Sequence, residues 1–319
     1  EQARLRHGSF SDQPSELIED RELRHKLGEK GFARRLTAEQ ARNVVQLVSR
    51  HSGATFSVPG AGKTTEALAT FALRAGANDK LLVVAPKNAF AAWDEQIIEC
   101  LPNLEDNFVR LRKTDKIPHQ LLAKPKLSII GYQQLVRVRE HIAEFLFSNN
   151  VHVFIDESHR IKGLYNLSTQ AILSFSHLPV GKLIMSGTPM PQSTDDLVPQ
   201  FNFLFPEVKA NADNVVDLVR KVYVRTNKSE LNLPSVTRHL IKVEMDPEQD
   251  KLYRLLKSEI AREAEKALRE NTKFALRRFG RSVTSVLQFV SNPALLAEKP
   301  DFKFAEELEE TLSRGDGPK

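Results

Sequence analysis

The sequence predicts an α/β fold in which helices cover both faces of a parallel β-sheet. Short, nearly continuous apolar runs recur along the first two thirds of the chain, as expected for strands that are buried on both faces. Helical stretches separate most of these runs, which gives the repeated β-α pattern of a doubly wound sheet. Polar clusters follow the ends of the runs, where sheets of this kind bind their ligands.

The predicted strands are residues 54–58, 80–85, 107–112, 127–130, 151–155 and 181–185. Before the first strand, Thr37 is placed to cap a helix whose apolar residues fall on one face. After the last strand, residues 197–205 are apolar and aromatic, which is typical of core packing. Alternating side chains over 236–245 predict one more strand, and a long helix is expected from Pro247 past Lys273.

The length of 319 residues and the hydrophobic content of 41% are enough for one large or two ordinary domains. We expect a charged helical extension over residues 1–35, a main α/β lobe over 36–229, and a strand and helices over 230–319 that open a second lobe. No apolar run approaches the ~20 residues of a membrane span. A single cysteine excludes an internal disulfide framework, and no signal-peptide pattern is present, so a cytoplasmic or nuclear protein is expected.

The net charge of +5 is not spread evenly along the chain. Between Arg254 and Arg281, nine Lys and Arg residues stand against four Asp and Glu residues, so this segment alone matches the surplus of the whole chain. Such a basic stripe is compatible with binding to a phosphate backbone. A solvated helix face explains it equally well, and the sequence leaves both interpretations open.

A glycine-rich turn at residues 59–64 joins the first predicted strand to a helix. Backbone N–H groups approach a bulky polyanion closely only where glycine leaves room, and the helix N-terminus adds a favourable dipole. The turn is therefore predicted to bind a nucleoside triphosphate, with Lys63 at the β- and γ-phosphates and the Thr64 hydroxyl on Mg²⁺. The expected nucleotide contacts are Pro59, Gly60, Ala61, Gly62, Lys63, Thr64 and Thr65. The alternative is a plain strand–turn–helix with a surface lysine.

Asp156 and Glu157 form an acidic pair at the end of the predicted strand 151–155. A carboxylate beside a phosphate loop can hold Mg²⁺, so Asp156 is the predicted metal ligand together with Thr64. Glu157 is predicted to polarise the attacking water as general base, which makes the expected catalytic set these two carboxylates and Lys63. Simple termination of the strand is the alternative.

Gln40 lies twenty residues before the first glycine of the turn. Its side-chain amide can act as donor and as acceptor toward adenine, which would make the nucleotide ATP rather than GTP.

Taken in order, these elements resemble the SNF2 family of superfamily 2 ATPases, which are double-stranded DNA translocases. The segment Pro-Lys-Asn-Ala-Phe-Ala-Ala-Trp at 86–93 is similar to the family's motif Ia, and Asp-Glu-Ser-His-Arg-Ile-Lys-Gly at 156–163 is similar to its D-E-x-H-x-I-K-N. Ser-Gly-Thr-Pro at 186–189 matches motif III, and the resemblance continues to about Leu312. Ser57 and the residues that follow it depart from the family's usual D-E-M, which points to a divergent branch, such as the SNF2-like proteins of bacterial anti-phage systems.

The resemblance implies a RecA-like P-loop NTPase domain that uses ATP and Mg²⁺ to move along double-stranded DNA. It also implies a second RecA-like lobe in the same chain, with other protein subunits as possible partners. The residues that it assigns to coupling are His159, Ser186 and Thr188, and those that it assigns to DNA contact are Lys87, Asn88 and Tyr132. Trp93 is expected to be a core aromatic residue. Nothing after Asn292 resembles the second lobe's core motifs, so this chain alone is expected to bind ATP·Mg²⁺ and to hydrolyse it slowly.

Two rival functions remain open. The first is another superfamily 2 helicase, which would act on RNA or single strands. The second is a nucleotide-dependent binding module, in which ATP only switches partner contacts. The complete acidic pair argues against the module, because a switch without turnover can lose Glu157.

Overall fold

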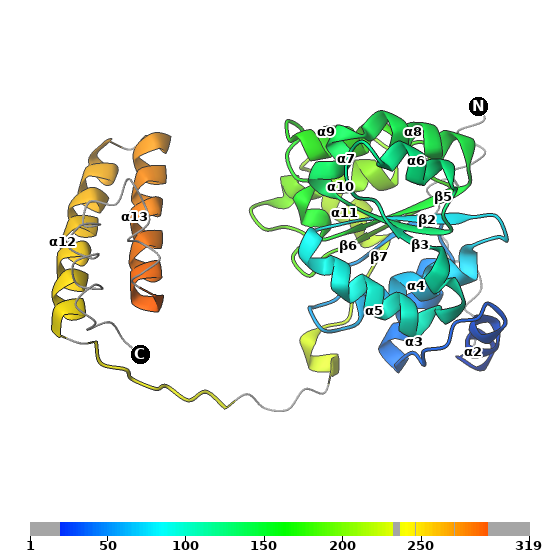
Figure 1. The fold of residues 1–319 in the computed structure, drawn as a ribbon, viewed down its shortest axis with the longest axis horizontal. Coiled ribbons are helices and arrows are strands. Elements are labelled where there is room, and N and C mark those ends of the chain that lie inside the picture. The colour runs from blue at the N-terminus through cyan, green and yellow to red at the C-terminus, as the bar shows by residue number, and fades with distance from the viewer. Residues whose placement is uncertain (1–19, 232–236, 246, 271, 293–319) are drawn as a thin grey trace. The chain divides into compact units, whose positions relative to one another are not determined.

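The computed structural model describes residues 20–231, 237–245, 247–270 and 272–292. The chain divides into two compact units, Glu1–Pro234 and Ser235–Lys319 (Figure 1). The first unit holds the sheet and the predicted chemistry, and the described part of the second unit holds two helices.

The sheet of the first unit has seven strands, and all of its neighbouring strands are parallel, as the sequence predicts. Its spatial order is β3-β4-β2-β5-β6-β1-β7. The strands are β1 (Ser52–Thr55), β2 (Lys80–Ala85), β3 (Phe108–Arg110), β4 (Leu127–Gly131), β5 (Val151–Asp156), β6 (Gly181–Met185) and β7 (Tyr223–Val224). Apart from β3 and the two-residue β7, these strands are buried almost throughout, because helices cover both faces.

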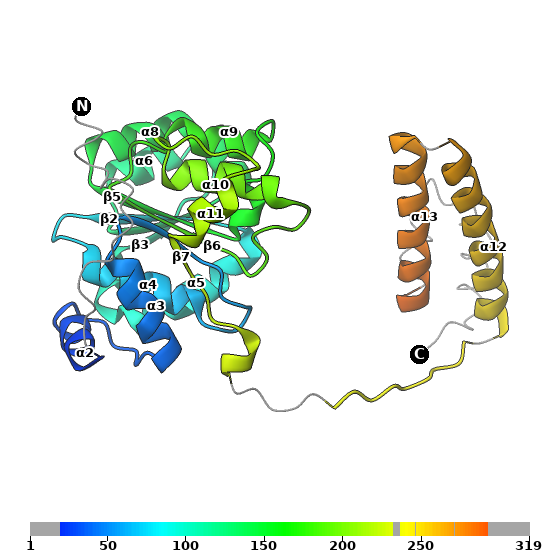
Figure 2. The same ribbon diagram turned by 180° about the vertical axis from the view of Figure 1, so that it is seen from behind.

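Figures 1 and 2 show the two helical layers on opposite faces of the sheet. One layer contains α2 (Asp20–Glu29), α3 (Ala38–Val48), α4 (Lys63–Arg74) and α5 (Phe90–Cys100). The other contains α6 (Ile117–Leu122), α7 (Tyr132–Arg137), α8 (Arg139–Ser148), α9 (Leu167–Ser174), α10 (Leu197–Leu204) and α11 (Val215–Arg220). Each layer packs its own apolar cluster against the sheet, and α10 confirms residues 197–205 as core.

The N-terminal helix α2 belongs to the first unit. Its Leu23 and Leu27 are 1% and 4% exposed and join the apolar cluster that also holds side chains of α3, α4 and α5. The described part of the predicted N-terminal extension is therefore a packed element of the lobe.

The helix α3 begins where the sequence predicts. Thr37 caps it by accepting a hydrogen bond from the Gln40 N–H, and the Gln40 side chain accepts in return from the Thr37 N–H, which completes a capping box. This cap fixes the position of Gln40 at the first turn of the helix.

The second unit departs from the sequence prediction at two points. The described residues 237–245 form no strand, and apolar members of the alternation such as Leu240 and Ile241 are more than 80% exposed. A strand needs a neighbouring strand for its backbone groups and a core for one of its faces. Among the described residues, this segment pairs with no strand and its apolar side chains are exposed.

The predicted long helix is in fact two helices. Helix α12 (Pro247–Glu270) ends before residue 273, and α13 (Lys273–Ser291) begins there with its own cap, because the Thr272 hydroxyl accepts from the Ala275 N–H at 3.1 Å. The two helices pack side by side as a hairpin (Figure 1). The resemblance beyond residue 292 lies outside the described residues. In the parts of the chain that the structure describes, no helix combines the length and apolarity needed to cross a bilayer.

The basic stripe at residues 254–281 falls on these two helices. Ion pairs one helical turn apart join Arg254 to Asp250, Lys266 to Glu270 and Arg269 to Glu265. All six of these side chains are at least 40% exposed, so each pair is a surface contact. Such surface pairs are typical of a solvated helix face, but the segment keeps its basic surplus, so both interpretations of the stripe stay open.

Candidate functional site

The glycine-rich turn follows β1 and leads directly into α4. Gly60 and Gly62 have φ angles of 84° and 82°, in the left-handed region that glycine adopts without strain, and Gly62 is the N-cap of α4. A Cβ atom on Gly62 would lie 2.2 Å from Gln40 Nε2, so this position also lacks room for a side chain. The first backbone N–H groups of α4 have no acceptor within the helix, so the N-terminus of this helix can bind an anion.

Lys63 is the first residue of α4, and its side chain returns over the turn. Its ammonium group donates to the backbone carbonyls of Ser57 and Val58, at 3.0 and 3.3 Å. Burial lowers the pKa of Lys63, while the carboxylates of Glu157 and Asp156 oppose that shift. The lysine therefore lies within electrostatic reach of both predicted catalytic carboxylates.

The register of the sheet explains this proximity. On β6, which lies between β1 and β5 in the sheet, Met185 is the partner of Thr55 at the end of β1 and also of Asp156 at the end of β5. Because they share this partner, the glycine-rich turn and the acidic pair begin at the same level of the sheet. Two strand spacings of about 4.8 Å each separate β1 from β5. The sequence prediction that they meet at the carboxyl edge agrees with this geometry.

Both oxygens of the Asp156 carboxylate are hydrogen-bonded. Oδ1 accepts from the Glu157 N–H at 2.9 Å, and Oδ2 accepts from the indole Nε1–H of Trp93 at 2.9 Å. Burial raises the pKa of Asp156, and the Trp93 hydrogen bond opposes that rise. Glu157 follows with φ and ψ of 51°, a left-handed conformation that costs a non-glycine residue about 1 kcal/mol. Such strain at a strand end is typical of functional sites.

A polar chain continues from Glu157 to the end of β6. His159 Nδ1 lies 3.2 Å from Glu157 Oε2 and 3.0 Å from the Ser186 hydroxyl. Ser186 Oγ in turn accepts from the Thr188 N–H at 3.1 Å. The three residues that the resemblance assigns to coupling thus contact one another and the predicted general base.

The amide of Gln40 holds the phosphate loop. Nε2 donates to the Ala61 carbonyl at 3.1 Å, and Oε1 takes part in the capping box of α3. These contacts leave the amide one further N–H, so its predicted role toward adenine stays a prediction. The structure assigns Gln40 a second task, which is to position the turn.

The other predicted nucleotide contacts differ in accessibility. Pro59 and Gly60 are exposed and Thr64 is half-buried. Thr65 is 1% exposed, and its hydroxyl donates to Gln96 Oε1 of α5 at 2.7 Å. Thr65 can therefore offer a ligand its backbone N–H, whereas its side chain points into the protein.

The three predicted DNA contacts also separate. Lys87 and Asn88 are exposed in the short 3₁₀ helix η1 (Lys87–Ala89), directly after β2. Tyr132 is only 6% exposed, and its hydroxyl donates to the carbonyl of Asp156 at 2.6 Å. This burial gives Tyr132 a contact with the acidic pair in place of the surface position that a DNA contact requires.

Sequence reasoning missed a buried polar network beneath the turn. Glu66 of α4 is fully buried and accepts from Asn43 Nδ2 at 2.7 Å and from the Thr55 hydroxyl at 2.8 Å. Asn43 also donates to Thr226 Oγ1, just after β7, and the Thr226 N–H donates to Ser57 Oγ. Burial raises the pKa of Glu66, and both hydrogen bonds oppose that rise. The partners come from four separate segments of the chain, so no local pattern in the sequence indicates the network.

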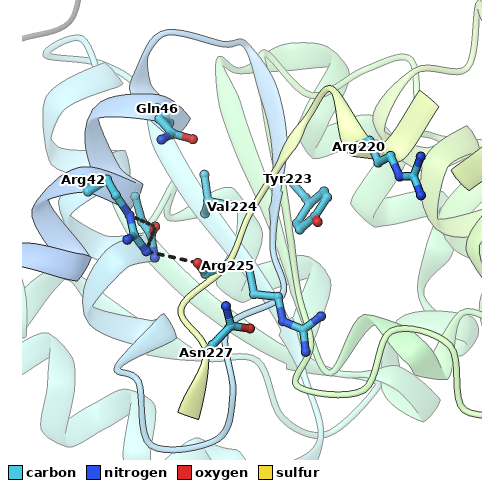
Figure 3. A pocket seen from close by; sticks show the side chains of 8 residues that line it. Arg42, Gln46, Arg220, Tyr223, Val224, Arg225 and Asn227 are labelled. Atoms are coloured by element: carbon cyan, nitrogen blue, oxygen red, sulfur yellow. Dashed lines mark hydrogen bonds between the residues drawn. The ribbon is translucent and has the colours of Figure 1, made fainter. Parts of the chain in front are cut away.

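A polar pocket of about 530 Å³ lies between α3 and β7. Figure 3 shows side chains that line it. Arginines from three positions line it, but Arg42 pairs with Glu230 at 2.6 Å and Arg220 pairs with Asp217 at 3.2 Å. Arg42 also donates to the Arg225 carbonyl, as the dashed line in Figure 3 shows. The pocket therefore lies where Arg42 of α3 contacts residues 225–230, which follow β7.

Comparisons with known proteins identify the family of the chain. The SNF2-related domain matches residues 37–214. The ISWI chromatin-remodeling complex ATPase CHR11 of Arabidopsis thaliana is 28% identical over 223 residues, which cover 62% of this chain and 21% of that protein. The DNA annealing helicase and endonuclease ZRANB3 of Mus musculus is 28% identical over 153 residues, which cover 46% of this chain and 14% of that protein. This chain thus spans about a fifth of the length of such relatives or less.

A solved structure supports the same fold. The SWI2/SNF2 ATPase core of Sulfolobus solfataricus, determined in complex with dsDNA, aligns with a TM-score of 0.55 and 18% identity, over 95% of this chain and 68% of that one. At this identity the likeness concerns the fold alone. The family match, in contrast, covers more than half of the sequence, and its bounds include the glycine-rich turn, the acidic pair and the end of β6. The chain therefore belongs to the SNF2-related domain family.

Proposed function

We propose that this chain is the ATP-binding lobe of a motor that moves along double-stranded DNA. The observation that carries the proposal is the common edge of the sheet, where Thr55 and Asp156 share Met185 as strand partner. This register brings the glycine-rich turn and two carboxylates to the same edge of the sheet, which supports phosphoryl transfer because that reaction needs both groups near one triphosphate.

Each group at this edge has a distinct role in the proposal. The amides of the turn and of the first turn of α4 bind the phosphates, and Lys63 neutralises the charge on the β- and γ-phosphates. Its present carbonyl partners, Ser57 and Val58, are weak competitors for an ammonium group once a polyanion is available. Glu157 accepts the proton of the attacking water, and its 40% exposed side chain can reach a solvent molecule.

The residues fit Mg²⁺ as the metal. Asp156 and the Thr64 hydroxyl are oxygen ligands, which this hard cation prefers. Among the described residues no group of three or more acidic, His or Cys side chains forms a metal cage. Mg²⁺ is suited to such a site, because it keeps several waters and shares its coordination with substrate phosphates. Bound there, the ion would neutralise charge on the triphosphate, while Asp156 orients it.

The polar chain from Glu157 through His159 to Ser186 supports a coupling role. A nucleotide that contacts Glu157 would disturb the hydrogen bonds at His159 Nδ1, and these reach the end of β6. By resemblance, that strand end faces the DNA surface. The exposed Lys87 and Asn88 would contact the phosphate backbone without reading its sequence.

A second lobe in the same polypeptide completes the proposed motor. CHR11 is about five times as long as the region that this chain matches. In the proposal, residues 36–229 form the first lobe and residues 230–319 open the second. Without the second lobe's arginine, hydrolysis should be slower by about 10³-fold or more. The protein would act on DNA in the nucleus or the cytoplasm, together with other subunits where its pathway requires them.

Substrate selectivity tests the proposal. We expect this chain to bind ATP·Mg²⁺, and we expect the longer protein that contains it to hydrolyse ATP faster when duplex DNA is added. Lys63→Ala should abolish nucleotide binding, whereas the control Lys209→Ala, at an exposed loop position, should not. Stimulation by RNA or single strands instead of duplex DNA would favour the rival helicase. Binding without any turnover in the longer protein would favour a nucleotide-switched module.

A further inference from the structure

Trp93 is the only tryptophan of the chain, and its environment is more specific than that of a core residue. It lies on α5 with 0% exposure, inside the apolar cluster on that face of the sheet. An indole N–H can only donate, and a buried donor needs a partner. The partner here is Oδ2 of Asp156, at 2.9 Å, although the two residues are 63 positions apart.

The acidic residue is held from three directions. Trp93 fixes Oδ2, the Glu157 N–H fixes Oδ1, and the Tyr132 hydroxyl donates to the backbone carbonyl of Asp156. Each carboxylate oxygen keeps a free lone-pair direction for a metal or a metal-bound water. The carboxylate therefore cannot rotate freely, and its open side is defined.

Without the indole N–H, Oδ2 would lose its donor while the Glu157 N–H still held Oδ1. Removing the N–H while keeping the ring would thus weaken the orientation of the ligand.

Helix α5 joins this residue to the phosphate loop as well. Gln96, three residues after Trp93, accepts from the Thr65 hydroxyl of α4 at 2.7 Å. Thr65 follows Thr64, the other predicted metal ligand. One face of α5 therefore contacts both segments between which the metal would be bound.

We propose that Trp93 is a positioning residue for Mg²⁺, which it serves by holding the carboxylate of Asp156 in a fixed orientation. The proposal rests on the proposed function in one respect, namely that Asp156 is the metal ligand. Residues that orient a metal ligand typically change metal affinity by about 10- to 100-fold when they are lost.

The test compares Trp93→Phe with Ile97→Val. The first substitution keeps an aromatic ring and removes the N–H, and the second trims a side chain that is 1% exposed on the same helix and makes no polar contact. Binding of a fluorescent ATP analogue is titrated with Mg²⁺, and binding in EDTA is measured as well. For Trp93→Phe we expect the half-saturating Mg²⁺ concentration to rise about 10-fold, with binding in EDTA unchanged. For Ile97→Val we expect no change in either quantity.

The emission of Trp93 provides an independent readout. In the native chain, the emission of this single tryptophan should respond to Mg²⁺·ATP, and Asp156→Asn should remove the response.

The possible outcomes separate the two proposals. A Mg²⁺ titration of Trp93→Phe that matches those of the native chain and of Ile97→Val would reduce Trp93 to a packing residue, and the inference would be wrong. Native binding of ATP that is independent of Mg²⁺ and unaffected by Asp156→Asn would instead overturn the assigned metal site, and with it the proposed function.

Discussion

Both edges of the sheet hold buried ionisable side chains, but the groups that surround these side chains differ between the edges. At the amino edge, the guanidinium of Arg74 donates to the carbonyls of Leu47, Arg50 and His51 at the end of α3, where a cation is stabilised by the helix dipole. Burial lowers the pKa of Arg74 to about 9. A neighbouring His152 pairs with Asp79 at 3.3 Å.

At the carboxyl edge, Lys63 also donates to backbone carbonyls, but the carboxylates of Glu157 and Asp156 lie near enough to oppose the fall in its pKa. The backbone there takes left-handed conformations at Gly60, Gly62 and Glu157. The amino edge has a pocket of about 320 Å³, so neither a hollow nor burial of charge distinguishes the two edges. The carboxyl edge is distinguished by its glycine-rich turn, whose Lys63 lies within electrostatic reach of two carboxylates.

Substitution of the general base should give the largest effect and would sharpen this contrast. We expect Glu157→Gln to reduce turnover by about 10³-fold in the longer protein while ATP·Mg²⁺ binding and thermal stability stay unchanged. Glu140→Gln is the matched control, because this glutamate is 87% exposed on α8. Single-turnover hydrolysis measures the effect, and native turnover in Glu157→Gln would remove this residue from the mechanism.

The amino edge should respond in stability instead. Arg74→Met leaves three carbonyls at the end of α3 without their donor, and should cost about 2–3 kcal/mol of unfolding free energy. ATP binding should persist at temperatures where the variant is folded. Denaturant unfolding beside the exposed control Arg139→Met checks this expectation. A loss of nucleotide binding by folded Arg74→Met would break the proposed division between the edges.

A pH effect is expected from Lys182, the second residue of β6 on the amino half of that strand. It is 1% exposed, with its ammonium group on the Ser176 carbonyl, and burial lowers its pKa from 10.5 to about 7. Between these two pKa values the unfolded chain binds more protons than the folded one. The free energy of unfolding should therefore rise with pH by up to ~1.4 kcal/mol per pH unit above pH 7, and it should not depend on Lys182 below pH 7. Unfolding of Lys182→Met across pH 7 to 10 should lack this slope. An unchanged slope would assign it to other groups.

The smallest effect is expected at Glu66, which lies under the phosphate turn but is fully paired. Burial raises its pKa, so its contribution to stability is present below pH 4.5 and is lost as the pH rises through the folded-state value. Glu66→Gln should therefore gain stability over the native chain as the pH increases from 5 to 8, since the Thr55 hydroxyl can turn to accept from the new amide. Thermal unfolding at both pH values measures the gain, and Glu105→Gln, at an exposed position, is the control. A loss of stability at pH 8 would show that the ionised carboxylate is required.

Features that arise from residues close together in the chain could be predicted from the sequence alone. The glycine-rich turn, the cap at Thr37 and the acidic pair at the end of a strand follow from local conformational preference and from a period of apolar residues. The carboxyl-edge position of the chemistry follows too, because parallel strands all end on one side.

Only the tertiary structure decided which side chains complete the site. The partner of Trp93 is 63 residues away and that of Asn43 is 183 residues away at Thr226, distances over which a single sequence carries no signal. The same limit explains the wrong strand at 236–245, since alternation indicates a strand only where another strand and a core are present. Local patterns specify what each segment can do, and the contacts between distant segments decide which of those possibilities is used.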